Sequence, residues 1–446
     1  MLPSETFTLA ARAAAPVPAP AVTIRRAPDR YRAQRITPPP AGLPQDDALR
    51  IAIVTPEIGP GAGVAHYWQA LALALSARHE VHVFAGASNG HPLPGVQFHR
   101  LPRARGGWFL AHATFFVAAN ARFGFERLLR RPPFDVVLGI GALTPFADVA
   151  TVHFVQAREL DLERRRLFPR ERSRTGLDQL DYALYSRAMG WLGRRFYRST
   201  KCLIVTISNS VRADLALFEG APLKGMVVVP NGVDTERFHP RNRERYRSEV
   251  RRELGFTGNE TAVLFVGNSW GRKGLRTAIE AIRGPGEANL RLIVVGDGRA
   301  APFIENLPGD VARRIVFVGM RNDDVERFYA AADVFMLPTL YEPFGLVILE
   351  ALASGVPTIA SACAGASEWL KDGRDLVLLQ DPSDGVEARA ALRSVVESPA
   401  FAESLSQNGR RAATQLEWSG VAARILAAVA ARVPIRSHGR TLPDAP

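Results

Sequence analysis

The sequence predicts an α/β protein of two domains, each a parallel sheet with helices packed on its faces. Three observations support this prediction. Short apolar runs alternate with helix-like segments, the alternation begins near Ile51, and it begins a second time near Thr261. A chain of 446 residues also has room for about two or three domains.

The composition is that of a soluble globular protein, with 47% hydrophobic and 22% charged residues. No apolar run approaches about 18 residues, so we expect no transmembrane helix. Cys202 and Cys363 form neither a disulfide framework nor a metal-binding spacing, so we expect a reducing compartment, the cytoplasm. The net charge of +12 favours an anionic partner, which can be nucleic acid, an anionic membrane or an anionic substrate.

Residues 1–48 are rich in alanine, proline and arginine, and we expect them to be disordered because they cannot bury an apolar core. They make a poor signal peptide, since Glu5 comes early and prolines interrupt the apolar run. We place the first domain at residues 49–231, the second at 232–431 and a C-terminal tail at 432–446.

The first domain opens with a βαβ unit whose first turn is rich in glycine. A strand that begins at Ile51 leads to Gly59, Gly61 and Gly63, and a helix follows over residues 66–78. Glycine in such a turn lets the backbone come close to a ligand. Ordinary turn chemistry is the commoner reason for glycine here, so the turn alone carries little weight.

Further apolar runs of the first domain are predicted to be buried strands. They lie at residues 80–85, 134–141, 148–154, 202–207 and 226–230. His153 lies at the C-terminal edge of one strand, where ligands bind parallel sheets, although a lone histidine is more often a core residue. Ser208 is predicted to cap a helix that runs to about Gly220.

Two segments of the first domain are strongly basic. Residues 103–131 carry six arginines and one glutamate, and residues 158–201 carry twelve basic and six acidic residues. Residues 106–131 are also rich in aromatic side chains and predict a helix that packs on the sheet or lies on a membrane surface. A charge run is usually a solvated face, but two such segments in one half of the chain favour an anionic partner.

The second domain repeats the alternation of strands and helices. Its predicted strands lie at residues 261–266, 290–295, 315–320, 332–338, 358–360 and 375–379. After the first of them, Arg272 and Lys273 precede a helix over residues 275–283. Two cations at a helix entrance can bind a diphosphate, although solvated surface charge is as common an explanation. Residues 388–431 are predicted to be mostly helical.

The chain is organised around the segment from Glu342 to Pro357. Pro343 fits a helix start, and Gly355 fits the C-terminal cap. Glu342 and Glu350 therefore flank a helix N-terminus, where free backbone N–H groups attract phosphate. Such a group can hold a sugar, a diphosphate and a ribose in a row, but an ordinary crossover helix with surface glutamates explains the pattern as well.

The sequence E-P-F-G-L-V-I-L-E, from Glu342 to Glu350, resembles the E-x7-E signature of glycosyltransferase family 4. Asn231–Asp234 is similar to the interdomain P-N-G-V-D element of that family, and Arg272–Gly274 is similar to its R-K-G element. The resemblance spans roughly residues 50–418. It implies the GT-B fold, in which two Rossmann-like domains face each other across a cleft and a C-terminal helix crosses back to the first domain.

The resemblance also implies a function. It implies a hexosyltransferase that is independent of metal, takes the sugar from a nucleoside diphosphate sugar and retains the anomeric configuration. The acceptor is expected to be a glycan or glycolipid, in cell-surface glycan, glycolipid or lipopolysaccharide assembly. The leaving phosphate is expected to take the acceptor proton, and Glu342 is not expected to be a nucleophile.

The same resemblance assigns site residues. The donor-binding residues are Gly63, Arg272, Lys273, Gly296, Met320, Glu342, Phe344, Gly345, Leu346, Val347 and Glu350. The residues expected to carry catalysis are His153, Arg272, Lys273 and Glu342. Glu350 is expected to bind the ribose, Glu342 and His153 the donor sugar, and the backbone at Met320 the base. Family members often have an arginine where this chain has Asn268, so the diphosphate role passes to the R-K-G pair.

We expect no cofactor and no essential metal, because no D-x-D motif lies in a plausible site. The expected partners are a nucleotide-sugar donor, a glycan or glycolipid acceptor, and an anionic membrane surface. The protein is expected to bind peripherally to the inner face of that membrane. Nucleic acid is not expected, since no recognised binding module is present. Two alternatives stay open: a nucleotide-sugar epimerase on the same fold, and a non-catalytic subunit of a glycan-assembly complex.

Overall fold

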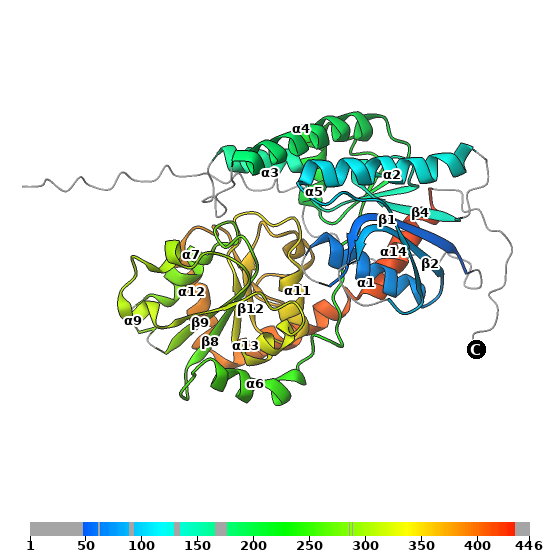
Figure 1. Ribbon diagram of the computed structural model, residues 1–446. Coiled ribbons are helices and arrows are strands. Elements are labelled where there is room, and N and C mark those ends of the chain that lie inside the picture. The colour runs from blue at the N-terminus through cyan, green and yellow to red at the C-terminus, as the bar shows by residue number, and fades with distance from the viewer. Residues whose placement is uncertain are drawn as a thin grey trace, which may run out of the picture.

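The computed structural model describes residues 48–60, 63–88, 93–128, 134–165, 176–284, 286–287 and 289–432. Gly61, the predicted N-terminal tail up to residue 47 and the tail from residue 433 lie outside the described residues. Two parallel sheets with helices on their faces form two lobes (Figure 1), so the predicted α/β fold is confirmed. The domain limits at residues 49, 232 and 431 stay predictions.

The first sheet has the strand order β3-β2-β1-β4-β5-β6-β7, and every neighbouring pair is parallel. Its strands are β1 (Arg50–Ile58), β2 (Glu80–Ser88), β3 (Val96–Arg100), β4 (Val136–Ile140), β5 (Val149–Val152), β6 (Leu203–Thr206) and β7 (Met226–Val228). Its central strands are buried on both faces, which is why they are continuous apolar runs in the sequence. β3 was not predicted because this edge strand is mostly exposed and includes Gln97 and His99.

The first sheet lies between two helical layers. Its helices are α1 (Val64–Ser76), α2 (Trp108–Leu128), α3 (Gln156–Arg164), α4 (Gly176–Ser199) and α5 (Asn209–Glu219), with a short 3-10 turn η2 (Gly141–Leu143). Ile51 and Ile53 face α1, whereas Ala52 and Val54 face the buried Phe115 of α2. The prediction that the 106–131 helix packs on the sheet is therefore confirmed for its inner face.

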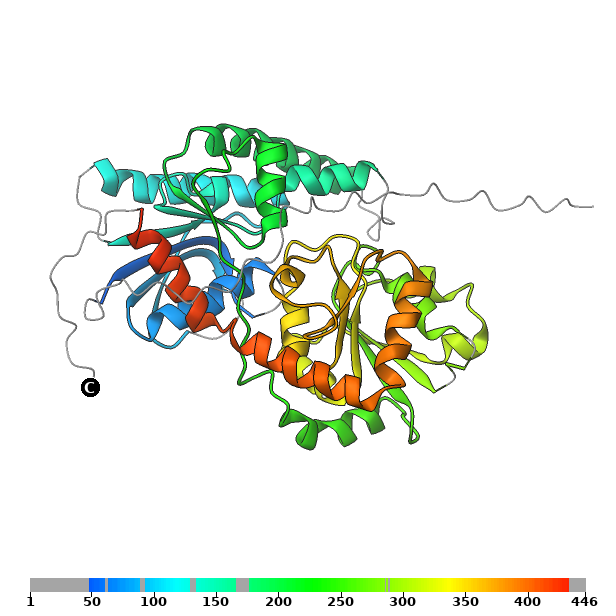
Figure 2. The ribbon, with the colours of Figure 1, turned by 180° about the vertical axis from the view of Figure 1, so that it is seen from behind.

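α2 and α4 run side by side on the outer face of the first lobe (Figures 1 and 2). Asp181 of α4 accepts a hydrogen bond of 2.6 Å from the backbone N–H of Trp108, at the start of α2. A carboxylate at that end also favours the α2 dipole. In the sequence, residues 158–201 stand out only by their charge, and the structure shows that most of the described part is helix.

The second sheet has the order β10-β9-β8-β11-β12-β13, again with parallel neighbours. Its strands are β8 (Thr261–Val266), β9 (Leu290–Val295), β10 (Ile315–Gly319), β11 (Val334–Leu337), β12 (Thr358–Ser361) and β13 (Val377–Leu379). The strand order reverses between β8 and β11. Parallel α/β sheets bind ligands at the carboxyl ends of the strands at such a reversal.

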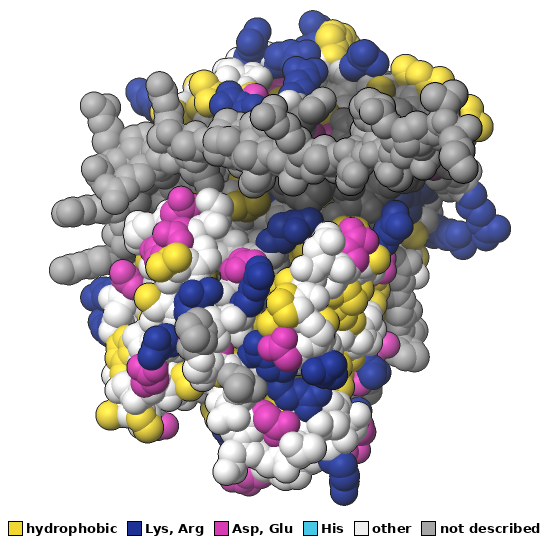
Figure 3. All heavy atoms as spheres, turned by 90° about the vertical axis from the view of Figure 1, so that its left-hand side faces the viewer, with side chains coloured by type: hydrophobic (Ala, Val, Ile, Leu, Met, Phe, Trp, Pro, Cys, Tyr) yellow, Lys and Arg dark blue, Asp and Glu magenta, His cyan; other side chains and the backbone are white. Residues whose placement is uncertain are grey.

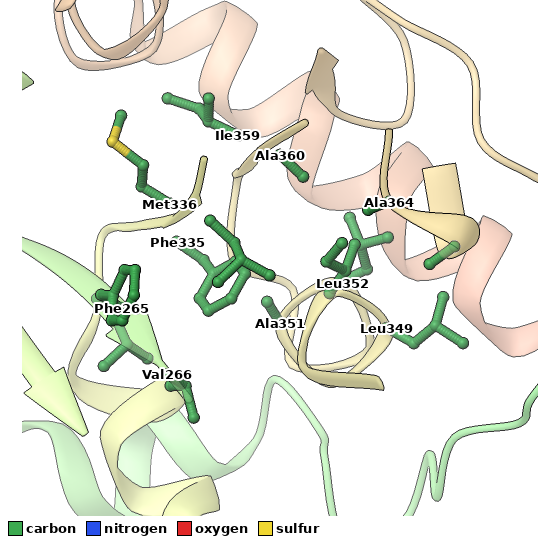
Figure 4. Packing of buried hydrophobic residues seen from close by; sticks show 14 of the residues in the cluster. Phe265, Val266, Phe335, Met336, Leu349, Ala351, Leu352, Ile359, Ala360 and Ala364 are labelled. Carbon is green, nitrogen blue, oxygen red and sulfur yellow. The ribbon is translucent and has the colours of Figure 1, made fainter. Parts of the chain in front are cut away.

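The helices of the second half complete this layer structure. They are α6 (Asn242–Glu253), α7 (Leu275–Ile282), α8 (Ala301–Ile304), α9 (Gly309–Ala312), α10 (Val325–Ala331), α11 (Leu346–Ala353), α12 (Gly385–Val396), α13 (Pro399–Thr414) and α14 (Trp418–Ala430), with a 3-10 turn η3 (Gly365–Trp369). Ala351 and Leu352 of α11 lie in one buried cluster with Phe335 of β11 and Ala360 of β12 (Figure 4). This packing fixes α11 against the sheet.

The predicted start of the organising helix is wrong by three residues. α11 begins at Leu346 rather than at Pro343, because Gly345 adopts a left-handed conformation with φ of 96°. The backbone before it is held extended, since the N–H of Gly365 donates to the carbonyl of Glu342 at 3.1 Å. Gly355 follows the helix with φ of 71°, as predicted for its end.

α14 crosses back from the second lobe and packs on α1 of the first (Figure 2). Trp418 at its start meets the ring of Tyr67 edge to face, with 5.4 Å between centroids. Val421 and Ile425 then continue the apolar cluster of the first sheet. The predicted crossing helix is therefore confirmed.

Candidate functional site

The site is built where β8 and β11 end, because the loops after these two strands bring three charged side chains together. The Nζ of Lys273 donates to the Oε2 of Glu342 at 2.7 Å. Arg272 donates to the carbonyl of Tyr341 at 2.6 Å and lies 3.5 Å from the same Oε2. Residues 70 positions apart in the chain thus form one charged cluster, which we call the Lys273–Glu342 cluster.

Glu342 is ionised within this cluster. Its burial opposes ionisation, but the charges of Lys273 and Arg272 outweigh it and lower the pKa of the carboxyl group. Lys273 is itself only 9% exposed. Two cations therefore share one carboxylate in a mostly buried setting, which leaves one net positive charge for an anion.

Two glycines make room for the cluster. A Cβ on Gly267 would collide with the side-chain stem of Lys273, and a Cβ on Gly274 would collide with the carbonyl of Pro338. Gly274 also has φ of 81°, a left-handed conformation that favours glycine. The close approach of the β8 and β11 loops thus depends on Gly274, whereas Gly267 makes room for the Lys273 side chain within the β8 loop.

The N-terminus of α11 adjoins the cluster. Phe344 and Gly345 are buried, whereas Leu346 and Val347 are half-buried. The first backbone N–H groups of a helix have no intrahelical partner, so this end can donate hydrogen bonds to an anion. The backbone N–H groups of residues 344–347, which were predicted to bind the nucleotide sugar, therefore lie next to the predicted cationic pair, Arg272 and Lys273.

Glu350 lies more than one turn inside α11 and has a different partner from Glu342. The hydroxyl of Tyr329 in α10 donates to Glu350 Oε2 at 2.8 Å. Burial raises the pKa of Glu350, and the hydrogen bond from Tyr329 offsets part of that rise. The two glutamates of the motif thus stand in separate environments. Sequence reasoning missed Tyr329, since no local signal marks it.

Gly296 and Met320 lie at the ends of β9 and β10. Gly296 has φ of 134°, and a Cβ there would collide with the carbonyl of Gly267. The side chain of Asn268 accepts a hydrogen bond of 2.8 Å from the N–H of Asp297, so Asn268 braces this turn. Met320 is 52% exposed. The edge of the second sheet that carries the cluster thus also carries these two residues.

His153 and Gly63 belong to the first lobe. The His153 ring packs edge-on against Tyr67 at 4.3 Å, and its Nε2 lies 3.1 Å from the Thr151 hydroxyl. Burial lowers the pKa of His153 to about 3, so the imidazole is neutral. Gly63 precedes α1 with φ of 79°. Among the described residues, no hydrogen bond, ion pair or ring contact joins His153 to the Lys273–Glu342 cluster.

The residues around Glu342 do contact the first lobe. The Ser208 hydroxyl donates to the carbonyl of Pro343 at 2.8 Å, and the Tyr341 hydroxyl lies 3.3 Å from Asp214. Burial raises the pKa of Asp214 to about 6, and the charge of Arg158 offsets part of that rise. None of these contacts was predictable, because each joins residues more than a hundred positions apart.

The described part of the chain holds no group of three or more His, Cys, Asp or Glu residues placed to bind a metal ion. Over the same residues, no helix has both the length and the apolar character that crossing a membrane requires.

The comparisons with known proteins agree with this architecture. The family model described as glycosyl transferases group 1 matches residues 260–397, and the model described as glycosyltransferase family 4 matches residues 61–237. An uncharacterized glycosyltransferase of Methanocaldococcus jannaschii is 28% identical over 337 residues, 72% of this chain and 83% of that protein. Mannosylfructose-phosphate synthase of Agrobacterium fabrum is 31% identical over 252 residues, and the match spans only 54% of its length.

Solved structures show the same fold. WaaG, a glycosyltransferase involved in lipopolysaccharide biosynthesis, superposes with a TM-score of 0.66 at 21% identity, covering 86% of this chain and 100% of WaaG. Anabaena HepE, solved in complex with UDP-glucose, superposes with a TM-score of 0.62 at 18% identity, covering 86% of this chain and 100% of HepE.

Proposed function

This chain belongs to glycosyltransferase family 4 and has the GT-B fold, and we propose that it moves a hexose from a nucleoside diphosphate sugar to an acceptor hydroxyl with retention of the anomeric configuration. The observation that carries this proposal is the Lys273–Glu342 cluster beside the N-terminus of α11. It combines cations and free backbone N–H groups, as a diphosphate requires.

The proposed donor lies along the carboxyl edge of the second sheet. Arg272, Lys273 and the N–H groups at residues 344–347 bind the diphosphate, and Glu350 accepts hydrogen bonds from the ribose. Glu342 binds the hydroxyls of the sugar, while Gly296 and Met320 border the base. The separate surroundings of Glu342 and Glu350 support this division, since one carboxylate faces cations and the other a phenol.

In the proposed reaction, negative charge grows on the leaving diphosphate as the glycosidic bond breaks. Lys273, Arg272 and the positive end of the α11 dipole stabilise that charge, which lowers the barrier. The departing phosphate accepts the proton of the acceptor hydroxyl on the same face of the sugar. In this proposal Glu342 binds the hydroxyls of the donor sugar and is not the nucleophile. No metal has a role in this proposal.

His153 has a positioning role in the proposal rather than an acid–base role. A pKa of about 3 keeps its imidazole neutral at any physiological pH, so it cannot supply a proton as an imidazolium. Held against Tyr67 and near Thr151, the ring can offer a fixed polar edge to a sugar hydroxyl.

The proposed acceptor is a glycan or glycolipid, and the proposed place is the inner face of an anionic membrane, to which the protein binds peripherally. The basic segments of the first lobe, residues 103–131 and 158–201, support this part of the proposal. Its similarity to WaaG, which takes part in lipopolysaccharide biosynthesis, favours cell-surface glycan, glycolipid or lipopolysaccharide assembly.

A thermal-shift panel of nucleoside diphosphates and nucleotide sugars tests the donor. A ligand present at about 100 times its dissociation constant should stabilise the protein by about 2.7 kcal/mol. The Lys273→Ala variant should lose about half of that stabilisation or more. If no nucleotide of the panel shifts unfolding, the proposed donor site is wrong. Release of free sugar without any acceptor would instead favour the epimerase alternative.

A further inference from the structure

The outer face of α4 combines apolar and basic side chains in one stripe. Leu180, Leu184, Arg187, Trp191 and Arg195 are exposed and follow one another at intervals of three or four residues. At about 1.5 Å per residue, positions 180 to 198 form a stripe roughly 27 Å long. Its first half is apolar, and its second half is basic. In Figure 3, basic (Lys or Arg) and hydrophobic side chains lie together along the top of the molecule.

The basic half of this stripe surrounds an open hollow of about 530 Å³, which we call the α4 pocket. It is lined by Trp191, Arg194, Arg195, Arg198 and Ser199. The side chain of Trp191 is 62% exposed. Within the described ranges, no hydrogen bond or ion pair engages the guanidinium group of any of the three arginines. All three arginines therefore line one hollow, and their guanidinium groups make no hydrogen bond or ion pair with the described residues.

The positive charge of these three arginines is not neutralised by acidic groups among the described residues around the pocket. Glu219 is buried beneath α4 against Gly193, and its Oε2 makes no hydrogen bond with the described residues. Burial raises the pKa of Glu219 to about 7, although the charges of Arg194 and Arg198 oppose that rise. One such carboxyl cannot offset three cations. The helix dipole favours cations at the C-terminal end of α4, but it does not require three around one hollow.

We propose that the α4 pocket binds the phosphate of an anionic lipid headgroup, so that the stripe on α4 lies on the surface of an anionic bilayer. Guanidinium groups match phosphate oxygens with paired hydrogen bonds, and arginine binds phosphate better than a point charge does. Trp191 has the amphipathic ring that favours the membrane interface. Leu180 and Leu184 contact the boundary of the acyl chains. The charge of the pocket selects anionic over neutral lipids.

This inference deepens the membrane part of the proposed function but does not require catalysis. Vesicle binding and nucleotide binding are separate measurements, so a failure of one leaves the other interpretable. The pocket lies on the first lobe, whereas the Lys273–Glu342 cluster lies on the second. A protein attached through α4 would hold the first lobe at the surface where a glycolipid acceptor lies.

Sedimentation with vesicles tests the inference. The pocket variant replaces Arg194, Arg195 and Arg198 with glutamine. Its matched control carries Arg245→Gln, Arg252→Gln and Arg313→Gln, which remove the same charge from exposed positions on the second half of the chain. Wild type and control should bind equimolar phosphatidylglycerol–phosphatidylcholine vesicles with similar affinity. The pocket variant should bind about a hundredfold more weakly, roughly fivefold for each arginine.

Two further measurements test whether a loss of vesicle binding comes from the α4 pocket. The thermal response to nucleotide should be unchanged in both triple variants, which shows that they fold. Tryptophan fluorescence should shift to the blue on anionic vesicles and lose part of that shift in Trp191→Phe. If the pocket variant binds vesicles as the control does, or if inorganic phosphate occupies the pocket while anionic vesicles do not bind, the inference is overturned.

Discussion

The ion pair between Lys273 and Glu342 is the residue-scale feature that decides how the site works. Both side chains are largely buried, so neither is compensated by water if its partner leaves. In the proposed donor complex, a diphosphate beside Lys273 would take up part of the positive charge that Glu342 neutralises in the free protein. The carboxylate of Glu342 would then be available to accept hydrogen bonds from sugar hydroxyls.

Replacement of Lys273 by alanine should weaken binding of the bare nucleoside diphosphate by about ten- to a hundredfold. A charge-assisted hydrogen bond contributes about 1.5–3 kcal/mol, and the variant also leaves Glu342 with less compensation. Titration calorimetry measures the affinity, and Arg283→Ala, at the exposed end of α7, is the control. If Lys273→Ala and wild type bind the nucleoside diphosphate with equal affinity, Lys273 does not bind the diphosphate.

His153 predicts a dependence of stability on pH. The unfolded chain binds a proton near pH 6.5 and the folded one only near pH 3, so the unfolded state holds more protons between these values. The free energy of unfolding should therefore fall as pH decreases, by roughly 2 kcal/mol between pH 7 and pH 5 from this group alone. Denaturant titrations at the two pH values measure it.

The His153→Asn variant should show a smaller loss over the same interval, since it has no buried group to protonate. A control, His239→Asn, changes a half-buried histidine that lies outside the core. Burial also lowers the pKa of His239, but less than that of His153, so this variant should keep most of the wild-type dependence. If His153→Asn and wild type lose the same free energy, the histidine does not carry the effect.

At the scale of single elements, strands that form continuous apolar runs could be predicted from the sequence. Elements whose conformation depends on neighbouring parts of the fold could not. The central strands of both sheets are apolar on both faces, so each was recognisable as a short run. β3 was not predicted because it is an exposed edge strand. α4 was not predicted as a helix because charged residues dominate its sequence, although its buried residues recur at helical spacing. The start of α11 was misplaced because a favourable proline at Pro343 is overridden by the conformation of Gly345.

Gly345 yields a prediction at this scale. A Cβ at that position would lie 3.1 Å from Ile348 and 3.2 Å from Glu342, and φ of 96° is strained for alanine. Gly345→Ala should lower stability by about 1 kcal/mol or more and should displace Glu342, which weakens binding of the intact donor. Thermal unfolding and donor titration measure the two effects.

Gly373→Ala is the matched control. Gly373 also has positive φ, 68°, but a Cβ there meets nothing within 4 Å. It should lose stability without losing donor affinity. The account of Gly345 fails if both variants keep the same donor affinity.

At the scale of the whole molecule, the two lobes are joined at several places. α14 packs on α1, and Ser208 donates to the loop that follows Glu342. Glu368 of the second lobe accepts hydrogen bonds from the backbone N–H groups of Asn209 and Ser210, at 2.7 and 2.9 Å. A carboxylate from one lobe thus caps α5 of the other, which fixes the lobes relative to each other.

Glu368→Ala should loosen this junction. Loss of the cap leaves the first N–H groups of α5 without their acceptor, so the separation between the lobes should become more variable. Small-angle X-ray scattering should show a larger radius of gyration than for wild type. Glu387→Ala is the control, since Glu387 accepts backbone hydrogen bonds within the second lobe only. Identical scattering from both variants would show that Glu368 does not hold the lobes.

Part of the candidate site could be predicted from the sequence, because the order of strands and loops that indicates the fold also places the loop residues. Arg272, Lys273 and Glu342 belong to loops after strands, and parallel strands that are neighbours carry such loops to one edge. The partners supplied by distant elements were not predictable, because no local pattern fixes them. Tyr329 at Glu350 and Glu368 at α5 are of this kind.

The most direct test of the central claim is titration calorimetry of Glu342→Gln and Glu350→Gln with the bare nucleoside diphosphate and with the intact nucleotide sugar. Glu350→Gln should weaken both ligands, because both contain the ribose. Glu342→Gln should bind the bare diphosphate almost as wild type does, since it leaves Lys273 for the phosphate, and should lose affinity only for the intact donor. Equal losses of diphosphate affinity in the two variants would contradict the assignment of one glutamate to the sugar and the other to the ribose.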